Sequence, residues 1–427
     1  MDHQIFPSIL SPTLASIVNE SFATGEAPSK MKQAFIRPLL KKPNFDPNIL
    51  NNYRSVSNLS FISKLIERIV ASSINTYLGE TGLAPILQSA YRPLHSTETA
   101  LLRFHNIIRQ VDQRKAVMLV LLDLSAAFDT IDQDCLLNCL QKQFGMKGVA
   151  LIWLASYVSE RSQAVQINPT AASSSTCLQF GVPQWSVVGP VLFTFYTAPL
   201  SDIIKVHGMA FYLCADGTQL YISAKPGEEL STKSSMHTCC ESVRKWIKQN
   251  KLKLNDSKTE VIYFYANHLE NQFDFRTFKI GESEINVINE GAVRNLGAYM
   301  NSDMSMTTRI TKTCRSIHFH LRKIGKIRKF LYNDTSKILV HSLILNKLDY
   351  CNSLLLGLSI ETMNRLQKMQ NKATKLVTRA KARDHVQPIL RELHWLPVKE
   401  RICFKVAITV FKCLNGLGPQ YLSEQRP

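Results

Sequence analysis

Apolar residues in the first 301 positions fall into short runs separated by polar turn segments, a pattern in which strands and helices alternate. Residues 33–40 read as a strand that ends at the turn-prone sequence KKPNFDPN. Residues 117–122 form a continuous apolar run, which is typical of a buried strand. Residues 209–213 and 220–223 are the predicted strands of a hairpin around the sequence CADGTQ. Several strands are therefore expected before residue 225.

Two helices are predicted among these strands. The first runs over residues 59–78, with Ser57 or Asn58 as its cap and Gly79 just past its end. The second begins after Ser96, whose hydroxyl can cap its first turn. Its predicted apolar face consists of Ala100, Phe104, Ile107, Ile108 and Val111.

After residue 301 the pattern becomes helical, with two apolar stripes, the first of which spans about 80° at roughly 100° per residue. The stripes are Ile310, Cys314, Ile317, Leu321 and Ile324, then Met363, Leu366, Met369, Ala373 and Leu376. The opposite faces carry Lys312, Arg315, Arg322, Lys326 and Lys329, then Arg365, Lys368, Lys372, Lys375 and Arg379. One basic face is usually only solvated surface, but two in succession favour contact with nucleic acid.

Most of the net charge of +18 lies in the same region. Residues 302–427 hold 23 Lys and Arg against 8 Asp and Glu, a net charge of +15. Nucleic acid and anionic membrane surfaces are the natural partners of such a region, and charge alone does not choose between them. No apolar run approaches the roughly 18 residues that span a bilayer, and the start has no secretory signal, so an intracellular protein is expected. The ten cysteines form no CxxC pair and are expected to be reduced, mostly buried thiols.

Two carboxylates lie at or near the ends of predicted strands, where they could bind a metal ion. Asp123 ends the buried apolar run, and Asp216 lies at the tip of the predicted hairpin. Taken singly, each is more often a residue that caps or forms a turn. Together with the loop at residues 181–184 (GVPQ) and the basic helices, they indicate the palm of a nucleic-acid polymerase. Such sites hold two divalent metals about 4 Å apart, and hard oxygen ligands suit Mg²⁺.

A series of sequence motifs along the chain strengthens the interpretation as a polymerase. The fingers-like segments are NNYRSVSNLSFISKLIER (51–68) and QSAYRPLHSTETALL (88–102). The palm-like segments are LLDLSAAFDTID (121–132), GVPQWSVVGPVLF (181–193), FYLCADGTQLY (211–221), WIKQNKLKLNDSKTEVIYF (246–264) and VRNLGAYMNSDMSM (293–306). Two further segments, LDYCNSLLLGL (348–358) and LHWLPVKERICFKVAITVFKCLNG (393–416), follow. In this order, the motifs resemble those of LINE-type (non-LTR) retrotransposon reverse transcriptases of the jockey-like branch.

The resemblance implies an α+β fold of the right-hand polymerase type, with an antiparallel palm sheet and an α-helical thumb. The expected parts are a lead-in helix (1–30), fingers (31–116), palm (117–301), basic helical thumb (302–385) and a truncated C-terminal helical region (386–427). The endonuclease domain that normally precedes the polymerase is not expected in this chain.

The resemblance also implies roles for individual residues. Asp123 and Asp216 would be catalytic carboxylates that bind the metals, with the Leu124 carbonyl as a further ligand. The nucleotide would be held by Lys41, Lys42, Arg54, Phe128, Pro183, Gln184 and Lys258. Phe128 would reject the ribose 2′-OH, and Lys258 would protonate the pyrophosphate. Without the family, Phe128 reads as a core residue and the basic residues as surface charges; Lys258 could pair with Asp256 or Glu260. The nucleic-acid contacts would be Lys312, Arg322, Lys326, Arg365, Lys368, Lys372 and Lys375.

Four positions depart from the family motifs. Gly217 stands where the motif YADD has its second Asp, and Cys214 replaces the Tyr of that motif. Trp185 replaces the second Gly of GVPQG, where an indole is expected to disturb both the nucleotide site and local packing. Ser55 replaces the Pro of NYRPIS, with little expected effect. The Asp-Gly pair at 216–217 is expected to suit the hairpin turn, so its cost falls on metal affinity.

The expected function is therefore RNA-directed DNA polymerisation, impaired in this copy, with template RNA, a DNA primer, dNTPs and a weakened two-Mg²⁺ site. By family, the protein would act in the nucleus after assembly of particles in the cytoplasm. A catalytically inactive nucleic-acid-binding relic or exapted protein is the alternative. An RNA-dependent RNA polymerase is disfavoured because Phe128 should exclude ribonucleotides.

Overall fold

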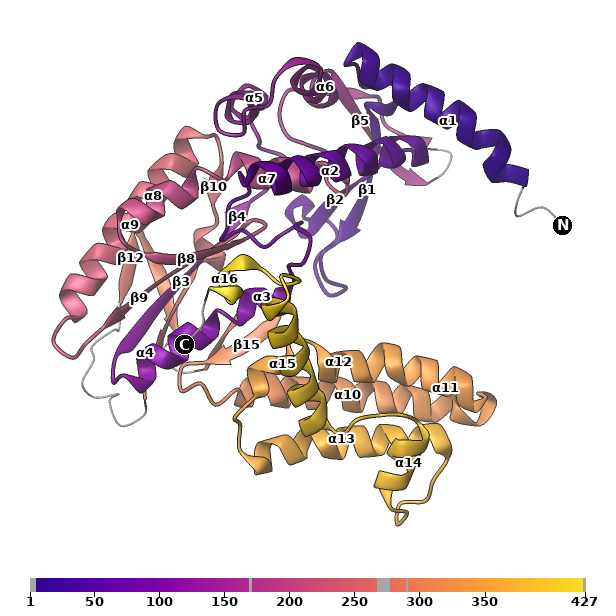
Figure 1. Cartoon of the computed structure of the whole chain (residues 1–427), viewed down its shortest axis with the longest axis vertical. Helices are drawn as coiled ribbons and strands as arrows, with labels where there is room; N and C mark the ends of the chain where they lie inside the picture. Colours follow the sequence, from indigo (N-terminus) through magenta and orange to yellow (C-terminus); the bar gives the residue numbers. More distant parts are fainter. Residues whose placement is uncertain (1–4, 169–170, 267–276, 289–290, 425–427) are drawn as a thin grey trace. The chain divides into compact units, whose positions relative to one another are not determined.

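The computed structural model describes residues 5–168, 171–266, 277–288 and 291–424 (Figure 1). Its contacts divide the chain into two compact units. Unit 1 comprises residues 1–93, 123–218 and 238–256, and unit 2 comprises residues 94–122, 219–237 and 257–427. Both units combine helices and strands, which confirms the α+β fold class. The division into fingers, palm and thumb remains a prediction.

The first sheet of unit 1 follows α1 (Ile5–Thr24) and η1 (Ser29–Met31) and has the order β2-β1-β5-β6, with β7 also on β5. β1 (Gln33–Leu40) pairs antiparallel with β2 (Tyr53–Asn58) and parallel with β5 (Arg161–Asn168). β6 (Ala171–Ala172), β7 (Thr176–Leu178) and η2 (Leu50–Asn52) are short. The predicted strand at residues 33–40 is thus confirmed, and it alternates between exposed and buried positions over its first half.

α2 (Phe61–Thr81) differs from its prediction at both ends. Its N-cap is Ser60, which accepts a hydrogen bond from the Ser63 amide, because β2 already includes Ser57 and Asn58. The helix continues past Gly79 to Gly82, whose left-handed φ of 65° ends it. Unit 1 also contains α5 (Gln133–Lys142), α6 (Gly148–Val158), α7 (Gly189–Tyr196) and α8 (Leu200–Val206).

The central strands are those that carry the two carboxylates. β12 (Phe278–Ile280), β13 (Ser283–Ile288), β11 (Glu260–Phe264), β3 (Ala116–Leu122) and β9 (Gly217–Ala224) follow one another in the sheet. The expectation of an antiparallel sheet holds for β11 and β3 but was wrong for β11 and β13, which pair parallel because β12 comes between them in sequence. β3 is almost completely buried, as predicted for residues 117–122. The hairpin partner of β9 is β8 (Ala210–Cys214), so both strands start or end nearer the tip than predicted. The turn is therefore reduced to Ala215 and Asp216.

The helix predicted after Ser96 consists of α3 (Thr97–Leu101) and α4 (Phe104–Asp112), with a break at residues 102–103. Ser96 caps α3 as predicted, in a reciprocal capping box with Thr99. In α4, the ring of Phe104 packs edge-on against Phe264 of β11, with 5.1 Å between centroids. α9 (Glu229–Gln249), β10 (Lys253–Leu254) and η3 (Asp256–Lys258) lead into β11.

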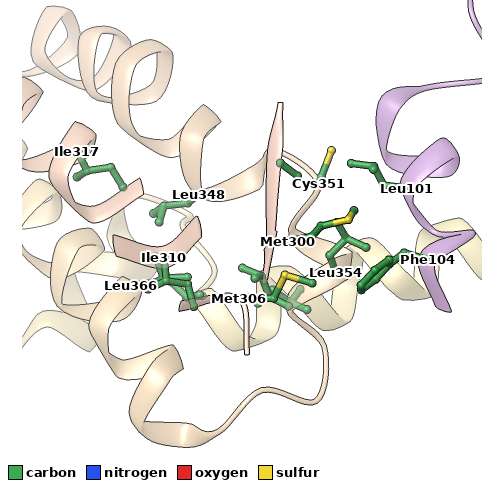
Figure 2. Packing of buried hydrophobic residues seen from close by; sticks show 14 of the residues in the cluster. Leu101, Phe104, Met300, Met306, Ile310, Ile317, Leu348, Cys351, Leu354 and Leu366 are labelled. Atoms are coloured by element: carbon green, nitrogen blue, oxygen red, sulfur yellow. The ribbon is translucent and has the colours of Figure 1, made fainter. Parts of the chain in front are cut away.

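The two basic amphipathic helices are confirmed as α10 (Thr307–Ile327) and α13 (Ile360–Thr378), which pack against each other. Figure 2 shows Ile310 and Ile317 of α10 in one apolar cluster with Leu366 of α13 and Phe104 of α4. The rest of unit 2 comprises β14 (Ala292–Asn295), β15 (Ala298–Asn301), η5 (Arg328–Phe330), α11 (Asn333–Val340), η6 (His341–Leu345), α12 (Asn346–Asp349), η7 (Asn352–Leu355), α14 (Val386–Glu392), α15 (Val398–Leu414) and α16 (Gln420–Ser423).

The helices and the cysteines bear on the kind of protein that was expected. Among the helices that the structure describes, none is long and apolar enough to cross a membrane. All ten cysteines are free, as predicted, but only Cys239, Cys240 and Cys351 are buried, and Cys177 and Cys403 are exposed. The expectation of mostly buried thiols was therefore wrong, because most of the cysteines lie on half-exposed positions of helices or near strand ends.

Candidate active site

The turn that carries Asp216 is held by a neighbouring segment of unit 1. The Ala215 amide donates a hydrogen bond to the Gln88 side chain at 3.3 Å. The Leu213 amide donates to the Leu87 carbonyl at 2.9 Å, and the Ser89 amide donates to the Leu213 carbonyl at 3.1 Å. Residues 87–89 thus run along the end of β8 and fix the position of the turn.

Ala215, rather than Gly217, has the left-handed backbone conformation in this turn, with φ of 54°. Gly217 is the first residue of β9, and a Cβ atom added to it would lie 3.4 Å from the Cys214 carbonyl oxygen, close to ordinary contact. The expectation that Asp-Gly serves as the turn was therefore wrong. A side chain fits at residue 217 without backbone strain, so a carboxylate can be restored there.

Asp123 directly follows β3, and Asp216 directly precedes β9, the neighbouring strand in the sheet. The Asn255 amide donates to the Asp123 carbonyl at 2.8 Å, and the Asn255 side-chain amide lies 3.4 Å from the Asp123 carboxylate. Leu124 begins β4 (Leu124–Ser125), where it pairs with Leu254 of β10. Both carboxylates are half-buried. A separation within about 6 Å, close enough to share metals, stays a prediction.

The GVPQ loop is strapped to the turn that follows Asp123. The Gly181 amide donates to the Ile131 carbonyl at 2.8 Å, and the Val182 amide donates to the Phe128 carbonyl at 2.9 Å. Gly181 has φ of 87°, and a Cβ atom there would lie only 2.9 Å from the Phe128 carbonyl oxygen. Only glycine permits this close approach. The loop and the Phe128 turn therefore form one unit.

Phe128 is half-buried, and its ring lies 5.1 Å from that of Phe193 on α7. One side of the ring thus packs in the core, while part of it remains accessible. The next residue, Asp129, accepts a hydrogen bond from the Gln184 side chain at 2.8 Å. Burial raises the pKa of Asp129, and the bond from Gln184 opposes that rise. This contact fixes the position of the Gln184 side chain. Nothing in the sequence predicted that Asp129 would make it.

Trp185 has φ of 69° and a side chain that is 65% exposed. The expected disturbance of local packing is therefore not present, because the indole lies outside the core. The strain is in the backbone instead, since a left-handed conformation costs a non-glycine residue roughly 1–2 kcal/mol.

Cys214 is half-buried, and burial, together with the nearby charge of Asp216, raises its pKa to about 11. It therefore remains a neutral thiol at physiological pH. Burial also raises the pKa of Tyr91, with smaller contributions from Asp216 and Cys214. Tyr91 is thus a neighbour of the site that the sequence did not single out.

The other predicted nucleotide residues lie on the β1–β2 hairpin and in the GVPQ loop of unit 1, and at residue 258 of unit 2. Arg54 on β2 is exposed and pairs in register with Leu39, and Ser55 pairs with Pro38. Lys41 and Lys42 follow β1 at the same end of the hairpin and are exposed. Lys258 is exposed at the end of η3, where Asp256 pairs with Arg244 at 3.8 Å. Pro183 is buried, and its carbonyl accepts hydrogen bonds within the loop.

Six of the seven predicted nucleic-acid contacts are exposed, as expected: Lys312, Arg322, Lys326, Arg365, Lys368 and Lys372. Lys375 is only half-exposed and donates to the Ala382 carbonyl, so the prediction of full exposure was wrong for it. Two other arginines of this region, Arg309 and Arg328, are buried and bind backbone carbonyls. Part of the positive charge is therefore structural.

The carboxylates meet the metal requirement only in part. Asp123, Asp216 and the Leu124 carbonyl offer hard oxygen atoms, which suit Mg²⁺. In the ranges that the structure describes, however, there is no group of three or more acidic, His or Cys side chains that could hold a metal. Gly217 occupies the position next to Asp216, so the set of ligands is of the right kind but lacks one carboxylate.

Residues 40–300 match the family model described as reverse transcriptase (RNA-dependent DNA polymerase). The “Probable RNA-directed DNA polymerase from transposon BS” of Drosophila melanogaster is 29% identical over 257 residues, which cover 58% of this chain and 27% of that protein. The “RNA-directed DNA polymerase from mobile element jockey” of the same organism is 22% identical and covers 61% and 28%. The “Probable RNA-directed DNA polymerase from transposon X-element” is 25% identical and covers 79% and 36%. The chain thus spans about a third or less of these relatives.

Among solved structures, apo telomerase from Candida tropicalis has a TM-score of 0.46 at 10% identity, covering 94% of this chain and 72% of the other. Telomerase from Candida albicans, solved with a fragment of telomeric RNA, has a TM-score of 0.41 at 10% identity, covering 88% and 64%.

Proposed function

Because the chain belongs to the reverse transcriptase family, we propose that it is the RNA-directed DNA polymerase part of a non-LTR retrotransposon protein, impaired in this copy. The observation that carries the proposal is the arrangement of the family's motifs. One half-buried carboxylate directly follows β3, another directly precedes the neighbouring strand β9, and a glycine-dependent loop bonded to the Phe128 turn holds Gln184. The substrates are template RNA, a DNA primer and dNTPs.

Asp123 and Asp216 would hold Mg²⁺, which when bound activates the primer 3′ oxygen and steadies the triphosphate. The protein's own part is to position the substrates. The half-buried ring of Phe128 lies under the sugar and excludes a 2′-OH. Its packing against Phe193 keeps the ring from moving aside. Gln184, fixed by Asp129, contacts the nucleotide and template. Arg54, Lys41 and Lys42 bind the triphosphate, for which the arginine fork is suited.

Two residues limit catalysis in this copy. With Gly217 in place of a carboxylate, less negative charge is available to bind metal, and metal stabilisation of the transition state is typically worth several kcal/mol. Trp185 adds a bulky, exposed indole to the loop that carries Gln184. A misplacement of about 1 Å there can reduce the rate roughly a hundredfold. We expect a combined defect of about a hundredfold or more.

A catalytically inactive nucleic-acid-binding protein is the second candidate. The observation that favours it is the same missing carboxylate at Gly217, together with the six exposed basic residues on α10 and α13. In the cell, the family's nuclear site of action and cytoplasmic assembly would apply to either candidate.

Primer extension separates these candidates. The purified chain is incubated with a DNA primer annealed to an RNA template, with dNTPs or with rNTPs, alongside the Gly217→Asp/Trp185→Gly variant. The proposal expects the variant to extend the primer with dNTPs only. Binding by both proteins with extension by neither would support the inactive binder, and extension with rNTPs would indicate an RNA polymerase.

A further inference from the structure

A buried carboxylate contacts residues 185–189, which continue the GVPQ loop, and takes no direct part in the proposed chemistry. Glu67 on α2 is only 1% exposed. One of its oxygens accepts hydrogen bonds from the Tyr157 hydroxyl at 3.1 Å and the Ser63 hydroxyl at 3.3 Å. The other oxygen accepts from the Val187 backbone amide at 2.5 Å. Glu67 therefore ties α2 directly to the loop.

The charge of Glu67 has a buried counterpart. Arg161 is 2% exposed, and its guanidinium donates to the Tyr157 carbonyl at 3.0 Å and lies over the Tyr157 ring at 4.9 Å. Burial lowers the pKa of Arg161, and electrostatic interactions with Tyr157 and Glu67 oppose that change. A buried carboxylate is expensive, and an apolar residue of similar size would often be as stable here. The presence of Glu67 thus points to a positional role beyond stability.

The loop itself transmits this tie. The amide and hydroxyl of Ser186 both donate to the Pro183 carbonyl, and the Gly189 amide donates to the Ser186 hydroxyl at 3.0 Å. A Cβ atom at Gly189 would lie 2.4 Å from that hydroxyl oxygen. Residues 183–189 are therefore a rigid turn with one anchor before it, at Gly181 and Val182, and one within it, at Val187.

We propose that Glu67 is a positioning residue for the incoming nucleotide: its bond to the Val187 amide holds the turn, and so holds Gln184 in place to contact the base pair. The proposal rests on the polymerase function proposed above. Without the bond, the anchor at Gly181 and Val182 and the contact of Gln184 with Asp129 remain, but the turn is no longer held at Val187, so the Gln184 backbone can shift. The consequence is weaker nucleotide binding rather than a loss of folded protein.

Two substitutions of Glu67 distinguish the effect of its hydrogen bond to Val187 from the effect of its charge. In Glu67→Gln, the amide oxygen can face the Val187 amide while its NH₂ group donates to the two hydroxyls, which can accept. This variant removes the charge and keeps the anchor. Glu67→Met keeps the volume and removes every hydrogen bond, leaving the Val187 amide unpaired. Glu80→Met, on an exposed turn of the same helix, is the matched control.

The first measurement is hydrogen exchange in the chain as it stands, comparing peptides that cover residues 183–189 and 116–122. Glu67→Met is expected to speed exchange in the loop about tenfold or more and to leave β3 unchanged, because the opening is local. Glu67→Gln and Glu80→Met should resemble the parent. If Glu67→Met also loosens β3, the same comparison is made with Glu67→Met/Arg161→Met, which removes both buried charges. Unchanged loop exchange, or loosening of β3 in the double variant as well, would overturn the proposal.

The second measurement is dNTP titration in primer extension, made in the Gly217→Asp/Trp185→Gly background. Glu67→Met should raise KM for dNTP about tenfold, with a smaller change in kcat, since the loop positions the substrate. Glu67→Gln should restore most of the affinity. An unchanged KM with a reduced kcat would mean that fewer molecules are folded, and would contradict a positioning role. If the background itself extends no primer, the polymerase function fails, whereas the exchange result still decides whether Glu67 holds the loop.

Discussion

Single residues at the site show how a local conformation changes the meaning of a sequence motif. Gly217 looked like a turn glycine, but Ala215 takes the left-handed position and Gly217 begins a strand. Trp185 looked like a packing defect, but its indole is exposed and its cost is in φ. In both cases the type of substitution was evident from the motif. Its structural consequence was not, because it depends on which residue of the turn has positive φ.

Asp129 is the residue whose ionisation reports most directly on the loop. Burial raises its pKa above 3.8, and the hydrogen bond from Gln184 opposes this. The pKa of this acid is higher in the folded protein than in the unfolded chain. Ionised Asp129 therefore lowers the free energy of unfolding at neutral pH, and this loss is regained as the pH falls through the folded-state pKa. We predict that Gln184→Leu raises the pKa further, because a bond that stabilises the carboxylate is lost.

An NMR titration of the Asp129 carboxyl carbon measures this change directly. Gln249→Leu, on an exposed position of α9, is the control and should leave the titration unaltered. A lower pKa in Gln184→Leu would show that the amide does not stabilise the carboxylate in solution.

At the scale of elements, the period of the apolar residues correctly predicted the strands and helices that pack together. Predictions of where these elements begin and end, which rest on local capping and turn residues, were wrong in some cases. β1, β3, α10 and α13 all follow from apolar patterns that burial enforces. The cap of α2 was misassigned because three neighbouring residues, Ser57, Asn58 and Ser60, can all cap a helix. Pairing with β1, a tertiary fact, takes the first two into β2.

The basic faces of α10 and α13 make a prediction about salt dependence. The exposed residues Lys312, Arg322, Lys326, Arg365, Lys368 and Lys372 are expected to contact the phosphates of template and primer. Replacing Lys326, Lys368 and Lys372 with Gln should weaken binding to an RNA–DNA duplex and reduce the slope of log K against log salt concentration. Each lost phosphate contact accounts for roughly 0.7–0.9 of that slope.

The measurement is duplex binding between low and moderate salt, with Lys142→Gln on an exposed position of α5 as the control. An unchanged slope in the triple variant would mean that these faces are only solvated. Arg309 and Arg328 are unsuitable for this test because they are buried and bind backbone carbonyls, which no charge count could reveal.

At the scale of the molecule, the sequence motifs indicated the family and most of the proposed site residues. The motifs also contain the supports of the site, namely Gln88 under the hairpin turn, Asn255 beside Asp123 and Glu67 under the loop, but they did not indicate what these residues hold. Each is distant in sequence from the residue that it holds. Only the folded chain brings such pairs together, so spacing and composition could not predict them.

The central claim is that Asp123 and Asp216 form a polymerase site that lacks one carboxylate. The most direct measurement is the rate of Mg²⁺-dependent extension of a DNA primer on an RNA template by three proteins: the chain itself, Gly217→Asp/Trp185→Gly, and the same double variant with Asp123→Asn. We predict that the double reversion raises the rate about a hundredfold or more, and that Asp123→Asn abolishes the gain. Because both reverted residues border one site, their effects need not add, and Gly217→Asp alone should recover less. Normal extension by the unmodified chain, or extension that survives Asp123→Asn, would contradict the account.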